Sequence, residues 1–206
     1  LYYVGGVVRD EILGKQSNDI DLMTNCDVHK VAELFDRCEV ARTSNARLAR
    51  IYIDNDLFEM GCLEEGDTIE HNLDSRDLTC NSILKDLITG QYYDPTGGIK
   101  DIKAKRIRFT TAAREKITAG KDPAELLRAF RFMAQLGWNF APDTEEAIKS
   151  YSQKTGGKIK IQLKAALGPA NWKKLINGKY KQKALAELEK YGFIDWAKTS
   201  FPDDFQ

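Results

Sequence analysis

Two aspartates, Asp19 and Asp21, stand one residue apart in a short apolar stretch that contains Ile20 and Leu22. Side chains alternate between the two faces of a strand, so both carboxylates are expected on the same face. Such close carboxylates repel each other, and a divalent cation between them removes the repulsion. The chain has only two histidines, and hard oxygen ligands favour Mg²⁺, which also binds substrate phosphates. Taken alone, the pattern also fits a surface turn or a chance alternation.

A third carboxylate and a glycine turn favour the catalytic interpretation of this pair. Glu59 lies in the segment DLFEM, on the face opposite Phe58 and Met60, and antiparallel pairing of strands is expected to bring it beside the two aspartates. Gly5 and Gly6 end an apolar run and precede a predicted helix. Backbone N–H groups at such a turn bind phosphate. The sequence therefore predicts a metal site next to a phosphate site.

A small sheet is needed to hold these residues in place. Alternating apolar residues and turn signals predict short strands at residues 1–4, 20–23, 47–54, 56–61 and 105–110. Helical spacing predicts helices over residues 8–13 and 27–38, the second of which is capped by Asn25 or Asp27. From Asp122 onward the pattern is helical almost to the end. Its breaks lie at residues 141–142, 156–157, 168–169 and 178.

Charge divides the chain in the same way. Residues 1–99 contain 9 Lys and Arg against 19 Asp and Glu, whereas residues 100–190 contain 21 against 9. This asymmetry favours an acidic catalytic module followed by a polyanion-binding one, although two solvated surfaces of opposite sign give the same counts. We therefore expect an α+β protein. A small mixed β-sheet with flanking helices is expected over residues 1–112, and an all-α segment over residues 113–206.

Composition argues against a membrane protein and a zinc protein. No apolar run approaches the roughly 18 residues that cross a bilayer, and no signal peptide is visible. The four cysteines are widely spaced and form no CxxC pair. We therefore expect no zinc site, no membrane partner and a reduced, cytoplasmic chain.

Four motifs occur in the order and at the spacing of a known family. They are GGVVRDEILGKQSNDIDL, RDLTCNS, YYDPTGGIKDIKAKRIRF and KDPAELLRAFRFMAQLGWNFAPDTEEAI, within residues 3–150. Together they resemble the class II tRNA nucleotidyltransferases (CCA-adding enzymes) and bacterial poly(A) polymerases, which are nucleotidyltransferases of the polymerase-β type. A weaker resemblance continues through KALAELEKYGFIDW. The resemblance implies a nucleotidyltransferase head followed by a helical neck and a short body-like RNA-binding segment.

The resemblance also implies roles for individual residues. Asp19 and Asp21 would hold two Mg²⁺ ions, with Glu59 as the third catalytic carboxylate. The triphosphate, ribose and base of the incoming nucleotide would be contacted by Gly5, Gly6, Arg9, Asp10, Arg76, Asp77, Asn81, Asp122, Glu125, Arg128 and Arg131. For RDLTCNS alone, an ordinary strand-to-helix turn with Asn81 as a helix cap is the structural alternative.

The implied reaction is template-independent addition of nucleotides from NTPs to the 3′ end of an RNA, with a tRNA as the expected acceptor. Attack of the RNA 3′-OH on an α-phosphate would release pyrophosphate, and two metal ions would clamp the attacking and leaving oxygens. The alternative is a non-catalytic or repurposed nucleotide- or RNA-binding relative with altered base specificity. Retention of three carboxylates favours the enzyme.

The base-reading helix departs from the family's pattern. The fourth motif of the family reads Glu-Asp-x-x-Arg, but here Lys121 replaces the glutamate and Glu125 stands where the arginine is expected. Arginine only donates hydrogen bonds, and ionised glutamate only accepts them. Asp122 and Glu125 together therefore favour a donor-rich base edge such as that of guanine, and we expect weak use of CTP. Alternatively, Glu125 pairs with Lys121 or Arg128 and selectivity is loose. Ser75 likewise replaces an arginine in the second motif.

The helical region offers lysines that either bind RNA phosphates or form a solubilising face. They are Lys154, Lys158, Lys160, Lys164, Lys173, Lys174, Lys179, Lys181 and Lys183. Trp172 or Tyr180 is expected to be available for base stacking. Members of the family carry further helical domains that grip the tRNA, and this chain stops near the start of them.

Overall fold

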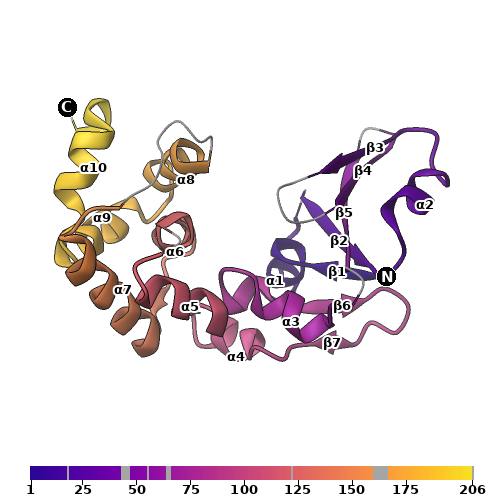
Figure 1. Ribbon diagram of the computed structural model, residues 1–206, viewed down its shortest axis with the longest axis horizontal. Coiled ribbons are helices and arrows are strands. Elements are labelled where there is room, and N and C mark those ends of the chain that lie inside the picture. The colour runs from indigo at the N-terminus through magenta and orange to yellow at the C-terminus, as the bar shows by residue number, and fades with distance from the viewer. Residues whose placement is uncertain are drawn as a thin grey trace. The chain divides into compact units, whose positions relative to one another are not determined.

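A computed structural model describes residues 1–17, 19–42, 47–54, 56–63, 66–121, 123–159 and 167–205. The chain divides into two units, Leu1–Lys103 and Ala104–Gln206. The first unit carries the main sheet and the second is mostly helical (Figure 1). The boundary that the sequence places after residue 112 lies inside the first long helix of the second unit.

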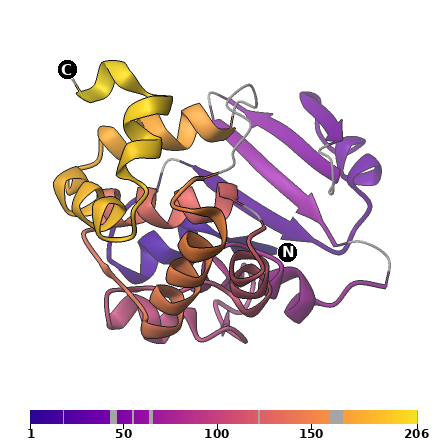
Figure 2. The same cartoon turned by 60° about the vertical axis from the view of Figure 1, so that its left-hand side comes forward.

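The first unit is built on a seven-stranded sheet with the strand order β3-β4-β5-β2-β1-β6-β7. The strands are β1 (Tyr2–Val4), β2 (Ile20–Thr24), β3 (Cys38–Arg42), β4 (Arg47–Ile53), β5 (Asp56–Cys62), β6 (Leu84–Asp86) and β7 (Tyr92–Tyr93). All neighbours are antiparallel except β2 and β5, which are parallel. Figure 2 shows β3, β4 and β5 side by side. The mixed sheet and its flanking helices confirm the expected α+β class.

The parallel pairing of β2 with β5 corrects one expectation. Glu59 is the Cα partner of Asp21, so it does lie beside this aspartate, but through a parallel pair rather than an antiparallel one. Parallel strands require a crossover connection. Here the chain crosses through α2 (Val28–Ala32) and enters the β3-β4-β5 meander, whose two reversals return β5 to the direction of β2.

The helix expected over residues 27–38 is shorter than its apolar pattern suggests. The side chain of Asp27 caps α2, as expected, by accepting a hydrogen bond from a backbone N–H of the first turn at 2.8 Å. The helix ends at Ala32, however, and Cys38 already begins β3. Phe35 and Cys38 still pack against the core beneath α2. A short apolar run fits a turn or a strand as well as a helix, so spacing alone did not locate the helix end.

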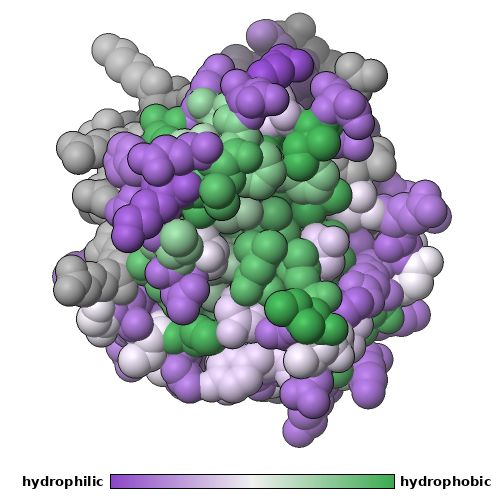
Figure 3. Space-filling view, turned by 90° about the vertical axis from the view of Figure 1, so that its right-hand side faces the viewer, coloured by the Kyte–Doolittle hydropathy of each residue, from purple (hydrophilic) through white to green (hydrophobic). Residues whose placement is uncertain are grey.

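The two faces of the sheet differ. On the α2 side the buried core consists of Leu22, Val28, Val31, Ala49, Ile51 and Met60, and Figure 3 shows hydrophobic side chains gathered on that side. On the other face Val4, Met23 and Leu84 pack with Leu73 of α3 (Ile69–Asp74). Because strand residues alternate, Asp21 shares the second face with Met23.

Three short helices complete the first unit around this second face. They are α1 (Gly6–Ile12), the 3₁₀ helix η1 (Thr79–Asn81) and α4 (Gly98–Lys103). All three carry residues of the motifs that the sequence analysis singled out. The first three motifs are therefore folded into one unit.

The second unit contains a run of helices and one small parallel strand pair. Its elements are β8 (Arg106–Ile107), α5 (Thr111–Thr118), α6 (Pro123–Leu136), β9 (Asn139–Phe140), α7 (Pro142–Thr155), α8 (Leu167–Ile176), α9 (Lys181–Lys190), α10 (Ile194–Ser200) and the 3₁₀ helix η2 (Pro202–Phe205). The breaks expected at Pro142 and Gly156 are confirmed. Pro142 begins α7, and Gly156 ends this helix with its backbone in the left-handed conformation. The strand expected over 105–110 shrinks to β8, and α5, capped by Thr110, begins two residues before the all-α segment expected over 113–206. Over the described ranges, no helix is long and apolar enough to cross a membrane.

Candidate active site

Asp21 and Glu59 lie side by side on neighbouring strands of the first unit. Asp21 is half-buried in β2, and Asp19 is exposed immediately before this strand. Burial raises the pKa of the Asp21 carboxyl, and the negative charges of Asp19 and Glu59 raise it further. The guanidinium of Arg76 acts in the opposite direction and lowers this pKa. Asp19 and Glu59 therefore both lie close enough to Asp21 to act on its carboxyl.

Arg50 holds Glu59 from the opposite strand. The two residues are Cα partners in the β4-β5 hairpin, and Arg50 Nε donates to Glu59 Oε1 at 2.9 Å. Arg50 was missed at the level of sequence, although a signal was present. The hairpin pairs Ile53 with Asp56, and counting back from that pair places Arg50 opposite Glu59, because turn geometry sets hairpin register.

Gly5 turns the chain directly beside Asp21. It precedes α1 with φ 78° and ψ −134°, a conformation that residues with a Cβ rarely adopt. A Cβ on Gly5 would lie 3.0 Å from Asp21 Oδ2 and 3.9 Å from a guanidinium nitrogen of Arg76. The glycine turn, Asp21 and Arg76 are therefore neighbours in space.

Arg9 joins the first motif to the second. Its Nε and Nη2 donate to the two carboxylate oxygens of Asp10 at 2.9 and 3.0 Å, and its Nη1 donates to Asn81 Oδ1 at 2.7 Å. Asn81 Nδ2 lies 3.5 Å from Asp77 Oδ1, and both of these residues are buried. Asn81 is the last residue of η1, and its side chain binds Arg9 rather than capping a helix.

The third motif packs against the second. Asp94 caps α4 by accepting hydrogen bonds from the backbone N–H groups of its first two residues at 2.7 and 2.8 Å. Thr79 Oγ1 donates to the buried carboxylate of Asp101 at 2.8 Å. A Cβ on Gly98 would lie 2.1 Å from the Thr79 carbonyl oxygen, so α4 and η1 touch. The position of Asn81 on η1 therefore depends on α4.

The residues expected to read the base belong to the second unit. Asp122 lies outside the described residues. Glu125, Arg128 and Arg131 are half-buried on α6, in the second unit. Arg131 Nη1 donates to the side-chain oxygen of Asn171 on α8 at 2.9 Å. A base-reading role for these residues stays a prediction.

Of the two aromatic residues expected to stack on bases, one is buried and the other is exposed. Trp172 is only 2% exposed, and its ring stacks on Phe201 with 4.6 Å between the centroids. Trp172 is therefore not available to a base, because an aromatic cluster near the end of the chain buries it. Tyr180 is 40% exposed and keeps the predicted accessibility. Lys160 and Lys164 lie outside the described residues.

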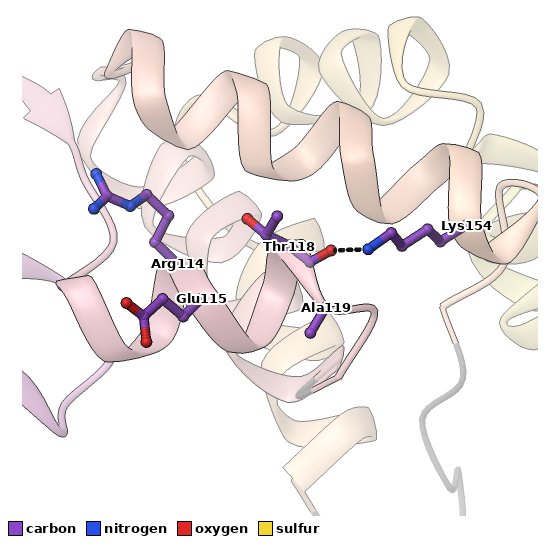
Figure 4. A pocket seen from close by; sticks show the side chains of 5 residues that line it. All are labelled: Arg114, Glu115, Thr118, Ala119 and Lys154. Carbon is purple, nitrogen blue, oxygen red and sulfur yellow. Dashed lines mark hydrogen bonds between the residues drawn. The ribbon is translucent and has the colours of Figure 1, made fainter.

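A separate hollow of about 460 Å³ lies in the second unit (Figure 4). It is lined by Arg114, Glu115, Thr118, Ala119 and Lys154. Lys154 Nζ donates to the Thr118 carbonyl oxygen at 2.8 Å, and Arg114 Nη1 donates to Asp143 Oδ2 at 3.1 Å. Both cations thus already have partners, and none of the residues expected in the site lines this hollow.

The donor set around Asp21 suits a hard divalent cation. Within the part of the chain that the structure describes, no three His, Cys, Asp or Glu side chains are arranged as a metal-binding group. Asp19 and Asp21 nevertheless offer carboxylate oxygens, and the pKa of Asp21 is raised first by burial and then by the negative charges of Asp19 and Glu59. A cation of the Mg²⁺ type, which takes one or two carboxylates together with substrate phosphates, fits this arrangement.

Comparison with known sequences gives consistent matches. The family described as Poly A polymerase head domain matches residues 1–64 and 38–108. The chain is 35% identical over 149 residues to the CC-adding tRNA nucleotidyltransferase of Halalkalibacterium halodurans, which covers 72% of this chain and 38% of that protein. It is 29% identical over 201 residues to the CCA-adding enzyme of Bacillus subtilis, covering 91% of this chain and 49% of that protein.

Comparison with solved structures agrees. The crystal structure of the Bacillus stearothermophilus CCA-adding enzyme in complex with CTP matches with a TM-score of 0.79 and 28% identity, over 93% of this chain and 48% of that chain. The chain thus spans about half the length of the relatives that match nearly all of it.

Proposed function

Because the chain belongs to the poly(A) polymerase head-domain family of class II tRNA nucleotidyltransferases, we propose that it is a metal-dependent, template-independent RNA nucleotidyltransferase. It adds nucleotides from NTPs to an RNA 3′ end and releases pyrophosphate. The observation that carries this proposal is the pairing of Asp21 with Glu59 across β2 and β5, with Asp19 at the strand entrance. A protein that only binds nucleotides has no need of three carboxylates that disfavour one another.

Members of this family generally use a divalent metal ion, and we propose Mg²⁺ as two ions held by Asp19 and Asp21, with Glu59 as the third catalytic carboxylate. Bound there, Mg²⁺ would supply charge stabilisation to the attacking and leaving oxygens. The protein itself contributes by holding the reacting groups in place. Holding the RNA 3′-OH in line with an α-phosphate makes the reaction effectively intramolecular.

The incoming nucleotide is proposed to bind at the turn formed by Gly5 and Gly6. Successive backbone N–H groups in a glycine turn form a concave site for phosphate oxygens. Arg9, held by Asp10 and Asn81, adds a fixed positive charge at the same turn. Asp77 and Arg76 complete the proposed pocket for the ribose and phosphates. Here Asp77 supplies hydrogen-bond acceptors and Arg76 supplies donors.

A tRNA is the proposed acceptor. The names of the relatives specify tRNA nucleotidyltransferase and CCA-adding activities for those proteins. The second unit adds exposed lysines such as Lys173, Lys174 and Lys181, which suit an RNA backbone. A cytoplasmic location is proposed with this acceptor, and all four cysteines are free, which agrees with a reducing compartment.

The test is incubation of the protein with each labelled NTP, Mg²⁺ and a tRNA that lacks its 3′ end. Extension of the tRNA that requires Mg²⁺ and releases pyrophosphate is expected. The second candidate is a non-catalytic nucleotide- or RNA-binding relative, which the unusual Glu125 favours. That candidate predicts binding of NTP or RNA without extension. No extension with any of the four NTPs would therefore contradict the enzyme and leave the binding protein.

A further inference from the structure

A row of charged residues crosses four strands at the level of Asp21. Glu59 is the Cα partner of Asp21, Arg50 is the partner of Glu59, and Glu39 on β3 is the partner of Arg50. Strands lie about 4.8 Å apart, so the row from Asp21 to Glu39 spans about 14 Å. Directly opposite residues point to the same face of a sheet. The row therefore continues the carboxylate group toward the sheet edge.

Arg50 carries the positive charge in this row of otherwise acidic residues. Its backbone lies between those of Glu59 and Glu39 in the row, and its side chain bonds Glu59, from Nε to Oε1 at 2.9 Å. Glu59 Oε1 is thereby engaged within the protein. The second oxygen, Oε2, remains for whatever binds beside Asp21.

The Arg50 guanidinium is expected to have two effects on a metal ion that binds beside Asp21. By bonding one carboxylate oxygen, it limits the rotamers of the Glu59 side chain and so fixes its other oxygen. By its charge, it opposes the binding of any further cation at the neighbouring carboxylates. About 10 Å, two strand spacings, separates it from Asp21.

We propose that Arg50 is a positioning residue for the nucleotidyl-transfer reaction, which aligns the third carboxylate, Glu59, beside Asp21. This inference rests on the proposed function. Arg50 touches neither nucleotide nor RNA in this role and acts only through Glu59. The arrangement also weakens the affinity of the free protein for divalent cations.

Replacement of Arg50 should therefore move metal binding and turnover in opposite directions. In Arg50→Met the aliphatic stem is retained and the charge is lost. Coulomb's law at this separation predicts roughly threefold tighter binding of Mn²⁺ to the free protein at low ionic strength. Loss of the bond should lower kcat by about tenfold or more, as is typical for residues that orient a metal-site carboxylate. The KM for NTP should change by less than about twofold, because Arg50 does not contact the nucleotide.

The measurements use the 206-residue chain. Mn²⁺ affinity is measured by electron paramagnetic resonance of the free ion, without nucleotide or RNA. Arg50→Lys keeps the charge but not the planar guanidinium, so it should restore wild-type Mn²⁺ affinity and recover only part of kcat. Glu39→Gln is the matched control, because it alters the other neighbour of Arg50 in the same row and should leave kcat within about twofold of wild type.

Two results would overturn the inference. One is an Arg50→Met variant with unchanged kcat. The other is a variant in which Mn²⁺ affinity and kcat fall together, since that would mean general disruption of the site. If the wild type transfers no nucleotide, the proposed function fails by itself. The Mn²⁺ comparison then tests only the stated effect of Arg50 on divalent-cation affinity, and unchanged Mn²⁺ affinity in Arg50→Met overturns that part.

Discussion

Single residues around Asp21 are held by close contacts that tolerate little change. Its carboxylate lies near other negative charges and near Arg76, and Gly5 leaves no room for a side chain above it. The raised pKa of Asp21 means that its charged form costs stability at neutral pH, and this cost disappears as the pH falls below that pKa. Residues that reduce stability in this way cluster at functional sites.

The first prediction concerns Asp21→Asn, which keeps the shape of the side chain and removes its charge. Transfer should fall by more than about 100-fold, since even residues that merely orient metal ligands typically cost 10- to 100-fold. The melting temperature should stay the same or rise, because the cost of the buried charge is removed. Steady-state kinetics and thermal unfolding check both parts. Near-normal turnover would contradict the metal assignment, and Asp19→Asn should lower transfer in the same way.

The second prediction compares two glycines with positive φ. Ala at Gly5 meets both an unfavourable φ of +78° and Asp21 Oδ2 at 3.0 Å, whereas Ala at Gly14 meets a φ of +68° and nothing within 4 Å. Ala at Gly14 should cost about 1–2 kcal/mol of unfolding free energy for the backbone, and Ala at Gly5 about 1–3 kcal/mol, because its ψ of −134° lies outside the left-handed helical region. Only Gly5→Ala should also lower kcat, because its Cβ displaces Asp21. Equal activity losses in the two variants would show that strain alone is responsible.

At the scale of elements, the site depends on which strands and helices meet. The parallel β2-β5 pair places Asp21 beside Glu59, and the β4-β5 hairpin places Arg50 behind it. The contact of α4 with η1 sets the position of Asn81, which holds Arg9. In the second unit α6 presents Glu125 on a helix whose inner side is anchored by buried Leu126, Leu127 and Phe130. The helix is therefore intact, and only its polar side departs from the family's pattern.

The third prediction concerns the polar side of α6. If Glu125 takes part in base selection, an acceptor stands where the family has a donor, and wild-type use of CTP should be weak. Glu125→Arg should then recover CTP incorporation, by a factor that corresponds to about 1–3 kcal/mol for acceptors of the base that are otherwise unpaired. Competition among the four NTPs on wild type and variant measures this. Strong wild-type preference for CTP and then ATP, unchanged in Glu125→Arg, would exclude Glu125 from base selection.

At the scale of the whole molecule, the chain joins an acidic unit to a basic one. The carboxylates, the glycine turn and the first three motifs are in the first unit, and the lysine-rich helices are in the second. A negatively charged catalytic face needs metal ions before it accepts a polyanion, whereas a basic surface binds it directly. The division of charge thus matches the proposed division between chemistry and RNA binding.

The fourth prediction tests this division through salt. If the lysines bind RNA phosphates, the logarithm of the association constant for tRNA should fall linearly with the logarithm of salt concentration, with a slope of several units. Replacing Lys173 and Lys174 together by Ala should reduce that slope by about 1.4–1.8, because each neutralised phosphate contributes about 0.7 in a single strand and about 0.9 in a duplex. Filter binding at salt concentrations from about 50 to 200 mM measures the slope. An association constant that does not change with salt concentration would indicate that these lysines form a solubilising face instead.

Part of this site is present in the sequence because it is local. The proximity of Asp19 to Asp21, the glycine pair, the Asp27 cap and the start of α7 at Pro142 each depend on residues within one or two turns of chain. Motif order and spacing supplied the family and the α+β class in the same way. These features require no knowledge of what packs against them.

Only the tertiary structure decided the contacts between distant segments. The bond from Arg9 to Asn81 joins residues 72 positions apart, and the parallel pairing of β2 with β5 depends on the crossover through α2. Trp172 could be placed inside the aromatic cluster, and the expected helix over residues 27–38 cut short at Ala32, only once the neighbouring elements were known. Counting from the hairpin turn could place Arg50 opposite Glu59, but the bond between them and the position of Glu59 beside Asp21 became visible only in the folded sheet. The reason is that burial and strand direction are set by long-range packing, which residue types and spacing do not encode separately.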